Sequence, residues 1–165
     1  MKPKIVAIVP MRHESERVQG KNYRIFAGKP LYQHIVSTLL LCPAIDTVMI
    51  DTDSDLILKD AKRSFPDIKL YLRPDQLRNE MTPMNDVLLN SVNQIEADFY
   101  LQTHSTNPLL RNTSIAGAID AFTTSLPEHD SLFSVTRLHT RLWDSSANPL
   151  NHDPSFLLRT QDLEP

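Results

Sequence analysis

An unbroken apolar run near the amino terminus is the feature that most constrains the fold. Residues 5–9 read Ile-Val-Ala-Ile-Val, and no polar side chain interrupts them. A strand with one face in water shows an alternating pattern, whereas an unbroken β-branched run is typical of a strand buried on both faces. Because such strands lie in sheets covered by helices on both sides, the run favours an α/β fold.

Strand and helix patterns alternate along the rest of the chain. Further strands are predicted at 47–50, 68–72, 99–101 and 132–135. Helices with apolar residues at helical spacing are predicted to begin at Pro30, Leu56, Thr82 and Asn112. We expect Ser54 to cap the second helix and Thr82 the third, with Pro83 in its first turn. The alternation predicts one α/β domain over residues 1–165 with a mostly parallel sheet.

The composition argues against several classes of protein. The chain has 165 residues, of which 41% are apolar and 22% charged, as in ordinary globular domains. Its net charge of -3 gives no overall basic field for nucleic acid. The apolar run at 5–9 is too short for a signal-peptide core or a membrane span. We therefore expect a cytoplasmic protein with neither a nucleic-acid nor a membrane partner.

The cysteine and the scattered histidines form no metal-binding motif. Cys42 is the single cysteine, so an intramolecular disulfide and a cysteine-rich metal site are both excluded. It falls in an apolar helical stretch and is predicted to be a buried thiol. His139, His152 and Asp153 are scattered loop residues, and we expect no metal there.

Four loops are the places where a ligand is expected. In parallel α/β sheets, ligands bind beyond the carboxyl ends of the strands. The loops that follow predicted strands are 10–22, 51–53, 73–84 and 103–111. This placement is an expectation from the fold class and carries no chemistry by itself.

The first of these loops concentrates basic side chains. Arg12, Arg17 and Lys21 lie within ten residues, and Gly20 permits close approach of the backbone. Arginine forks phosphate oxygens and lysine supplies a point charge, so the loop suits a triphosphate. It is not a P-loop, because Ser15 stands where that motif needs glycine and Asn22 where it needs Ser or Thr. On charge alone, a solvated basic loop partly neutralised by its two glutamates remains open.

Two short motifs connect this loop to a known family. The residues in order are Pro10, Arg12, Ser15, Lys21, Asn22 and then Gly28-Lys29-Pro30-Leu31. They resemble the amino-terminal signature of the acylneuraminate cytidylyltransferase family. The related 3-deoxy-manno-octulosonate cytidylyltransferases carry another version of it, and residues 15–22 resemble a blend of the two. Glu16 and Gln19 depart from the lysine and proline that are usual there. The resemblance covers essentially the whole chain and implies a three-layer, Rossmann-like fold of the nucleotide-diphospho-sugar transferase type.

The resemblance also implies roles for individual residues. Arg12 and Lys21 correspond to catalytic cations that stabilise the transferring and leaving phosphates. The implied nucleotide-binding residues are Met11, Arg12, Ser15, Arg17, Asn22, Arg73, Thr82 and His104. His104 takes the place of a glutamine that faces cytosine. From the residues alone, Arg73 could instead pair with Asp75 or Glu80, and His104 could be structural.

Sugar-binding residues are implied in two segments. His104-Ser105-Thr106-Asn107-Pro108-Leu109 is similar to the family's Gln-x-Thr-Ser-Pro-Leu, and residues 159–165 are similar to a segment near its sugar-binding and dimer region. The implied sugar contacts are Thr106, Asn107, Arg111 and Gln161. Arg111 could equally lie in solvent.

Asp51-Thr52-Asp53 is similar to the family's Ser-Thr-Asp at a strand end. Paired acids there could hold Mg²⁺ or cap the next helix, and Asp53 is a weak candidate for a metal ligand. In the family, the acidic pair that holds Mg²⁺ lies in a carboxyl-terminal part that this sequence does not include. We therefore expect a shortened chain whose metal ligands are unknown.

The resemblance implies that CMP is transferred from CTP to a sialic-acid-like 2-keto sugar acid, with release of pyrophosphate. Mg²⁺ is the implied cofactor and a homodimer the implied assembly. Two alternatives remain at this point. One is a nucleotide-binding or assembly module without turnover, and the other is a glycosyltransferase of similar fold that uses Asp51-Thr52-Asp53 as its metal motif.

Overall fold

The computed structural model describes residues 2–163. The chain separates into two compact units, one that ends at Glu128 and one that begins at His129. The last two residues of the motif at 159–165 lie outside the described residues. The single-domain interpretation of residues 1–165 stays a prediction.

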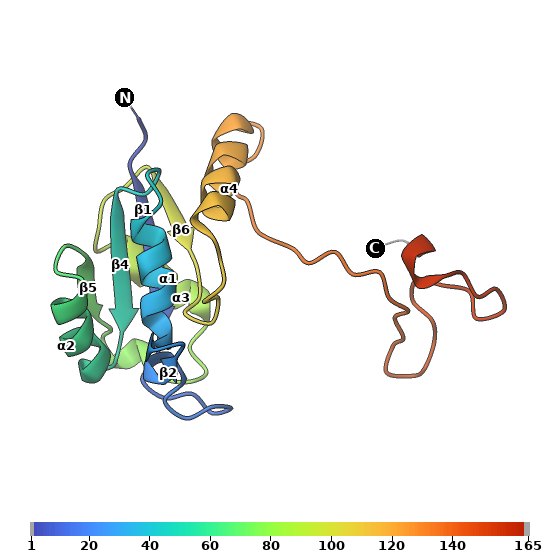
Figure 1. The fold of residues 1–165 in the computed structure, drawn as a ribbon, viewed down its shortest axis with the longest axis horizontal. Helices are drawn as coiled ribbons and strands as arrows, with labels where there is room; N and C mark the ends of the chain where they lie inside the picture. Colours follow the sequence, from blue (N-terminus) through green and yellow to red (C-terminus); the bar gives the residue numbers. More distant parts are fainter. Residues whose placement is uncertain (1, 164–165) are drawn as a thin grey trace. The chain divides into compact units, whose positions relative to one another are not determined.

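The first unit is built on a parallel sheet of four strands in the order β5-β4-β1-β6 (Figure 1). The strands are β1 (Ile5–Met11), β4 (Thr47–Thr52), β5 (Lys69–Leu72) and β6 (Phe99–Gln102). All seven residues of β1 are buried, because β4 and β6 flank it on both sides and helices cover both of its faces. The buried strand predicted from the apolar run at 5–9 is confirmed.

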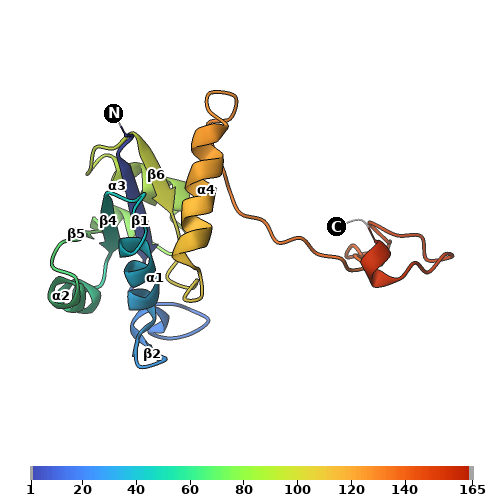
Figure 2. The same cartoon turned by 45° about the horizontal axis from the view of Figure 1, so that its top comes forward.

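Helices cover both faces of this sheet (Figures 1 and 2). They are α1 (Leu31–Leu40), α2 (Asp55–Ser64), α3 (Met84–Val92) and α4 (Asn112–Thr124). Val9 of β1 packs with α1, α2 and α4 in one apolar core, whereas Ile8, which points to the opposite face, packs with Leu88 and Val92 of α3. The three-layer α/β fold is confirmed.

Short elements complete the first unit. They are the 3-10 helices η1 (Lys21–Tyr23) and η2 (Asp75–Leu77) and a hairpin formed by β2 (Ile25–Phe26) and β3 (Lys29–Pro30). Both central residues of the hairpin turn have positive φ, 44° at Ala27 and 87° at Gly28. Two-residue hairpin loops of this kind match the twist of the strands that they join.

Most predicted elements are confirmed to within about two residues, and Cys42 is buried as expected. Ser54 caps α2, and its hydroxyl accepts a hydrogen bond from the backbone N–H of Ile57 at 3.3 Å. The predicted cap at Thr82 is wrong, because α3 begins at Met84 and Pro83 takes the N-cap position. Among residues 2–163, no helix is long and apolar enough to cross a membrane.

The predicted strand at 132–135 is wrong. These four residues are exposed and form no strand, and Phe133 is 82% exposed. The pattern of apolar residues does favour a strand. A strand, however, also needs a partner that pairs with its backbone, and no described residue supplies one.

The second unit consists of loops and one 3-10 helix, η3 (Thr160–Asp162). A turn is closed by an isolated bridge between Trp143 and Pro149. Asn151 supports this turn, because its side chain accepts from the N–H of Leu142 and donates to the carbonyl of Thr140. Hydrogen bonds of side chains to backbone groups, more than apolar burial, order this unit.

Candidate functional site

A cavity of about 590 Å³ opens at the carboxyl ends of the strands in the first unit. The end of β1 and the loop after it contribute residues between Pro10 and Asn22, and Asp53 follows β4. Residues between Arg73 and Met84 follow β5, and residues 104–106 follow β6. All four strands therefore send a loop to one cavity, which lies where ligands bind in open parallel sheets.

Most of the predicted site residues line this cavity. They are Met11, Arg12, Ser15, Arg17, Lys21, Asn22, Asp53, Arg73, His104 and Thr106. Thr82, Asn107 and Arg111 are not part of its lining. Gln161 belongs to the second unit, where it is exposed in η3. Contact of any of these residues with a ligand stays a prediction.

Three cations of the first loop are available to a ligand. Arg12, Arg17 and Lys21 line the cavity, and none of them forms an ion pair within residues 2–163. Glu14 contacts the ring of His13 at 3.6 Å and not one of these cations. The geometry therefore disfavours a loop in which the glutamates neutralise these three cations.

Gly20 shapes the loop that carries these cations. Its φ of 62° places it in the left-handed region, from which η1 begins. A Cβ atom at this position would lie 2.7 Å from the ring of Tyr23, so a side chain would clash as well as strain the backbone. The Tyr23 ring in turn stacks on His13 at a centroid distance of 5.2 Å. The turn thus holds Lys21 on the cavity side of a compact loop.

Asn22 links two walls of the cavity. Its Nδ2 donates to the carbonyl of Arg12 at 2.6 Å, and its Oδ1 accepts from the hydroxyl of Ser105 at 2.6 Å. Both Asn22 and Ser105 are buried. Because both ends of the amide bind the protein, Asn22 ties the cation-bearing loop to the loop that carries His104.

Arg73 is the most buried charged residue of the cavity wall. Its side chain is 2% exposed, and its Nε donates to Oδ1 of Asp51 at 2.6 Å. The alternative pairing with Asp75 or Glu80 is wrong, because Arg73 pairs with Asp51, and Asp75 pairs with Arg78 at 2.8 Å. Arg73 directly follows β5, which lies beside β4, and this register brings Asp51 within reach.

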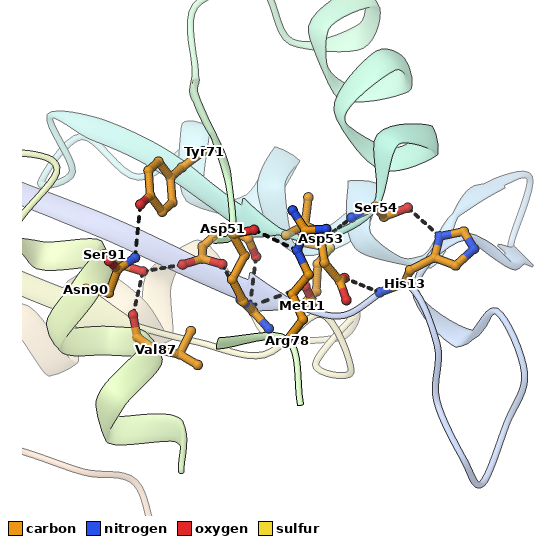
Figure 3. A network of polar contacts seen from close by, with 12 residues as sticks. Met11, His13, Asp51, Asp53, Ser54, Tyr71, Arg78, Val87, Asn90 and Ser91 are labelled. Atoms are coloured by element: carbon orange, nitrogen blue, oxygen red, sulfur yellow. Dashed lines mark hydrogen bonds and ion pairs between the residues drawn. The ribbon is translucent and has the colours of Figure 1, made fainter. Parts of the chain in front are cut away.

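Asp51 and Asp53, the acidic pair at the end of β4, bind different partners (Figure 3). Asp51 accepts from Arg73 with one oxygen and from Ser91 with the other at 2.5 Å. Asp53 accepts from the backbone N–H of His13 at 2.6 Å. Neither carboxylate caps α2, since Ser54 does so, and the capping interpretation of this pair is wrong.

The part of the chain that the structure describes forms no metal site from protein side chains alone. Within residues 2–163, no three His, Cys, Asp or Glu side chains lie close enough together to hold a metal ion. Asp53 lines the cavity and offers one carboxylate. Mg²⁺ commonly binds through one or two carboxylates together with substrate phosphates, so Asp53 fits a metal that arrives with a nucleotide. Asp51 is occupied by Arg73 and Ser91 and does not complete a pair.

The loop after β6 presents two exposed polar residues to the cavity. His104 and Thr106 are exposed, and the His104 ring lies 3.4 Å from Nε2 of Gln102. Arg111 stands at the N-cap position of α4 without a capping bond and is exposed. An exposed Arg111 is compatible with both interpretations, so its contact with a sugar acid stays a prediction.

Sequence reasoning did not single out three residues that organise this site. They are His13, Ser91 and Ser105. Ser91 did leave a signal, because it lies four residues after Val87 on the apolar side of its helix, where a polar residue needs a partner. His13 and Ser105 left none, because their partners depend on how the loops fold.

Relatives with similar sequences are cytidylyltransferases of acidic sugars. N-acylneuraminate cytidylyltransferase A of Danio rerio is 26% identical over 96% of this chain and 38% of that protein. The 8-amino-3,8-dideoxy-manno-octulosonate cytidylyltransferase of Shewanella frigidimarina is 29% identical over 72% of this chain and 47% of that protein. The 3-deoxy-manno-octulosonate cytidylyltransferase of Escherichia coli is 28% identical over 66% and 42%. The chain spans less than half the length of each.

Solved structures show the same fold. A CMP:2-keto-3-deoxy-manno-octonic acid synthetase complexed with CTP matches with a TM-score of 0.66 and 22% identity over 75% of this chain and 49% of that one. A 4-diphosphocytidyl-2C-methyl-D-erythritol synthase matches with a TM-score of 0.65 and 19% identity over 93% and 71%. The sequence profile of the family described as Cytidylyltransferase matches residues 6–163, and the chain belongs to that family.

Proposed function

We propose that this chain binds CTP and transfers CMP to a 2-keto sugar acid of the sialic-acid type, with release of pyrophosphate. The observation that carries the proposal is the set of three cations, Arg12, Arg17 and Lys21, which line one cavity without an ion-pair partner in residues 2–163. A triphosphate supplies the negative charge that such a cluster lacks. The names of the sequence relatives support cytidine as the base and an acidic sugar as the acceptor.

The proposed reaction requires the protein mainly to position the two reactants and to stabilise the charge on the phosphates. The anomeric hydroxyl of the sugar acid attacks the α-phosphorus, the bond to the β-phosphate oxygen breaks, and the hydroxyl proton is lost to water. Arg12 and Lys21 stabilise the charge that develops on the transferring and leaving phosphates, and Arg17 assists. Fixed cations act more strongly in such a cavity than in water, because less water reorganises around the reacting groups.

Base recognition is proposed for the loop after β6. His104 lies at the cavity wall, and a ring nitrogen can donate to or accept from a cytosine edge. Thr106 lines the same wall. Met11 and Ser15 complete the proposed nucleotide contacts from the first loop.

Mg²⁺ is proposed as a companion of the nucleotide. When bound, Mg²⁺ would offset the negative charge of the phosphates. Asp53 is the residue of this chain that would hold it, through the carboxylate that lines the cavity.

The acceptor distinguishes two groups of relatives. One contains N-acylneuraminate enzymes and the other contains 3-deoxy-manno-octulosonate enzymes, at similar identity to this chain. We favour the sialic-acid type on the resemblance of residues 28–31 and 159–165, because residues 15–22 resemble a blend of the two signatures. Thr106, Asn107, Arg111 and Gln161 are the proposed contacts of the sugar acid.

Release of pyrophosphate tests the proposed reaction. The protein is incubated with CTP, Mg²⁺ and either N-acetylneuraminic acid or 3-deoxy-manno-octulosonic acid, and pyrophosphate is measured with a coupled assay. We expect release that depends on the nine-carbon acid, and loss of release in Arg12→Ala but not in Lys62→Ala, which changes an exposed lysine of α2. CTP binding without release with either acid would indicate a binding module. Turnover of a nucleotide sugar in a parallel incubation, with no release of pyrophosphate from CTP, would indicate a glycosyltransferase.

Assembly and location complete the proposal. The family resemblance supports a homodimer, which sedimentation velocity at micromolar concentration tests directly. A single species with the mass of one chain would contradict it. The cytoplasmic location stays a prediction from the sequence.

A further inference from the structure

We propose that Asp51 is a positioning residue for the nucleotide cavity, acting through Arg73 and Ser91. The proposal rests on the proposed function, because it concerns the same cavity. In this arrangement Asp51 touches no ligand. Its carboxylate instead holds Arg73 and Ser91 in the geometry that lets the first loop and the wall after β5 face a nucleotide.

The carboxylate of Asp51 is shared between two elements (Figure 3). Oδ1 accepts from Nε of Arg73 at 2.6 Å, and Oδ2 accepts from the hydroxyl of Ser91 at 2.5 Å. Asp51 and Ser91 are both fully buried, and Arg73 is nearly so. Since a buried carboxylate has no water to replace a lost partner, each bond constrains the position of both groups.

Arg73 connects Asp51 with the cavity wall. Its guanidinium donates to the carbonyl of Met11 at 3.4 Å, at the start of the cation-bearing loop. Its own carbonyl accepts from Nε of Arg78 at 2.8 Å, and Arg78 lines the cavity. Arg73 therefore joins the end of β1 to the loop after β5, and Asp51 fixes its orientation.

Ser91 anchors the opposite end of the same wall. It lies on α3, whose first residue, Met84, lines the cavity. Its hydroxyl is bound within the protein, because it donates to Asp51 and also contacts the carbonyl of Val87 at 2.9 Å. The segment between Arg73 and Ser91 is thus held at both ends by one carboxylate.

Hydrogen exchange without ligand tests the positioning itself. Ser91→Ala removes only the hydroxyl that reaches Asp51. Thr123→Val is the matched control, because Thr123 makes the same type of helical bond, to the carbonyl of Ile119 at 2.9 Å, without a partner at the cavity. We expect Ser91→Ala to speed amide exchange in peptides that cover 73–84, and Thr123→Val to leave exchange there unchanged. Equal exchange in the two variants would overturn the proposal.

Titration with CTP tests the consequence for the cavity. We expect the dissociation constant to rise about tenfold in Ser91→Ala, because a wall that is no longer held in place must be ordered when CTP binds. It should change less than twofold in Thr123→Val and return to within about threefold of the unchanged protein in Ser91→Thr, which keeps the hydroxyl. Ser91→Ala that binds CTP as the unchanged protein does would overturn the proposal.

The two measurements separate this proposal from the proposed function. If the unchanged protein binds no nucleotide, the proposed function fails, and the exchange comparison still decides whether Asp51 and Ser91 hold the wall. If CTP binds and the exchange in 73–84 is unaffected by Ser91→Ala, the positioning role fails while the proposed function stands.

Discussion

At the scale of single residues, the cavity contains two kinds of polar side chain. Asn22 and Arg73 bind other parts of the protein with their polar atoms and are buried. Arg12, Arg17 and Lys21 form no ion pair within the described residues. The first kind holds the loops in place, and the second is available to a ligand. The sequence marks all five as polar loop residues but does not separate the two kinds, because partners depend on register.

In the turn between β2 and β3, one residue has a backbone conformation that its residue type disfavours. Ala27 has a φ of 44°, and alanine is disfavoured there relative to asparagine or glycine. We predict that Ala27→Asn raises the free energy of unfolding by about 0.5–1 kcal/mol. Ala27→Val should lower it, because a β-branched side chain fits this region worse. Urea denaturation measures both, and an equal loss in the two variants would contradict the turn geometry.

At the scale of elements, the predicted pattern and the observed packing agree where the signal is local. The apolar run of β1 and the helical spacing of α4 are visible within about ten residues. The strand predicted at 132–135 shows the limit, because strand formation needs a partner that local pattern does not supply. The pair of Arg73 and Asp51 shows the same limit, since it depends on the register of β4 and β5.

That buried pair makes Asp51 important for stability as well. Asp51→Asn keeps the shape but leaves the Arg73 charge without its partner. We predict a loss of about 3–5 kcal/mol in the free energy of unfolding. Asp67→Asn, at an exposed position with no ion pair in the described residues, should change it by less than about 0.5 kcal/mol. Denaturant titration with both variants measures the difference, and similar small losses would contradict a buried ion pair.

Helices α1 and α2 are joined by a carboxylate that makes stability depend on pH. Asp60, whose side chain is 18% exposed, accepts from Tyr32, Gln33 and Arg63 at 2.6, 2.7 and 2.8 Å. Burial acts to raise the pKa of Asp60, but these hydrogen bonds outweigh it and lower the pKa below its ordinary value of 3.8. Burial also raises the pKa of Tyr32, so the phenol keeps the proton that it donates.

The lowered pKa of Asp60 determines the sign of the effect. A depressed carboxyl pKa contributes stability that is present above the unfolded value of about 3.9 and is lost as the pH falls through the folded value. We predict that Asp60→Asn costs about 1–2 kcal/mol at pH 6. The difference from the unchanged protein should shrink when unfolding is measured below about pH 4. A difference that stays constant between pH 6 and pH 3 would contradict this contribution.

At the scale of the whole molecule, the first unit carries both the layered core and the cavity. Its fold class and the loops that form the cavity can be predicted from the sequence, because local patterns of apolar and polar residues indicate the strands, the helices and the loops between them. The second unit is different, because it is ordered mainly by hydrogen bonds between side chains and backbone groups. No periodic pattern in the sequence predicts these bonds. Gln161 therefore remains a predicted sugar contact.

This division predicts that the first unit is sufficient for folding and for nucleotide binding. A fragment of residues 1–128 contains every residue that lines the cavity. We predict a single cooperative unfolding transition and a CTP affinity within about threefold of that of the whole chain. Circular dichroism and calorimetry measure the two properties. A fragment that unfolds gradually, or that loses CTP binding while folded, would show that residues 129–165 complete the unit.

Calorimetric titration with CTP, UTP, ATP and GTP, with and without Mg²⁺, tests the proposed nucleotide site most directly. We predict that CTP binds more tightly than the other three nucleotides and that Arg12→Ala weakens CTP binding by about 10- to 100-fold without loss of folding. Lys62→Ala should bind CTP as the unchanged protein does. A folded protein that binds no nucleotide, or that binds CTP equally well after Arg12→Ala, would contradict the assignment of the first loop to the triphosphate.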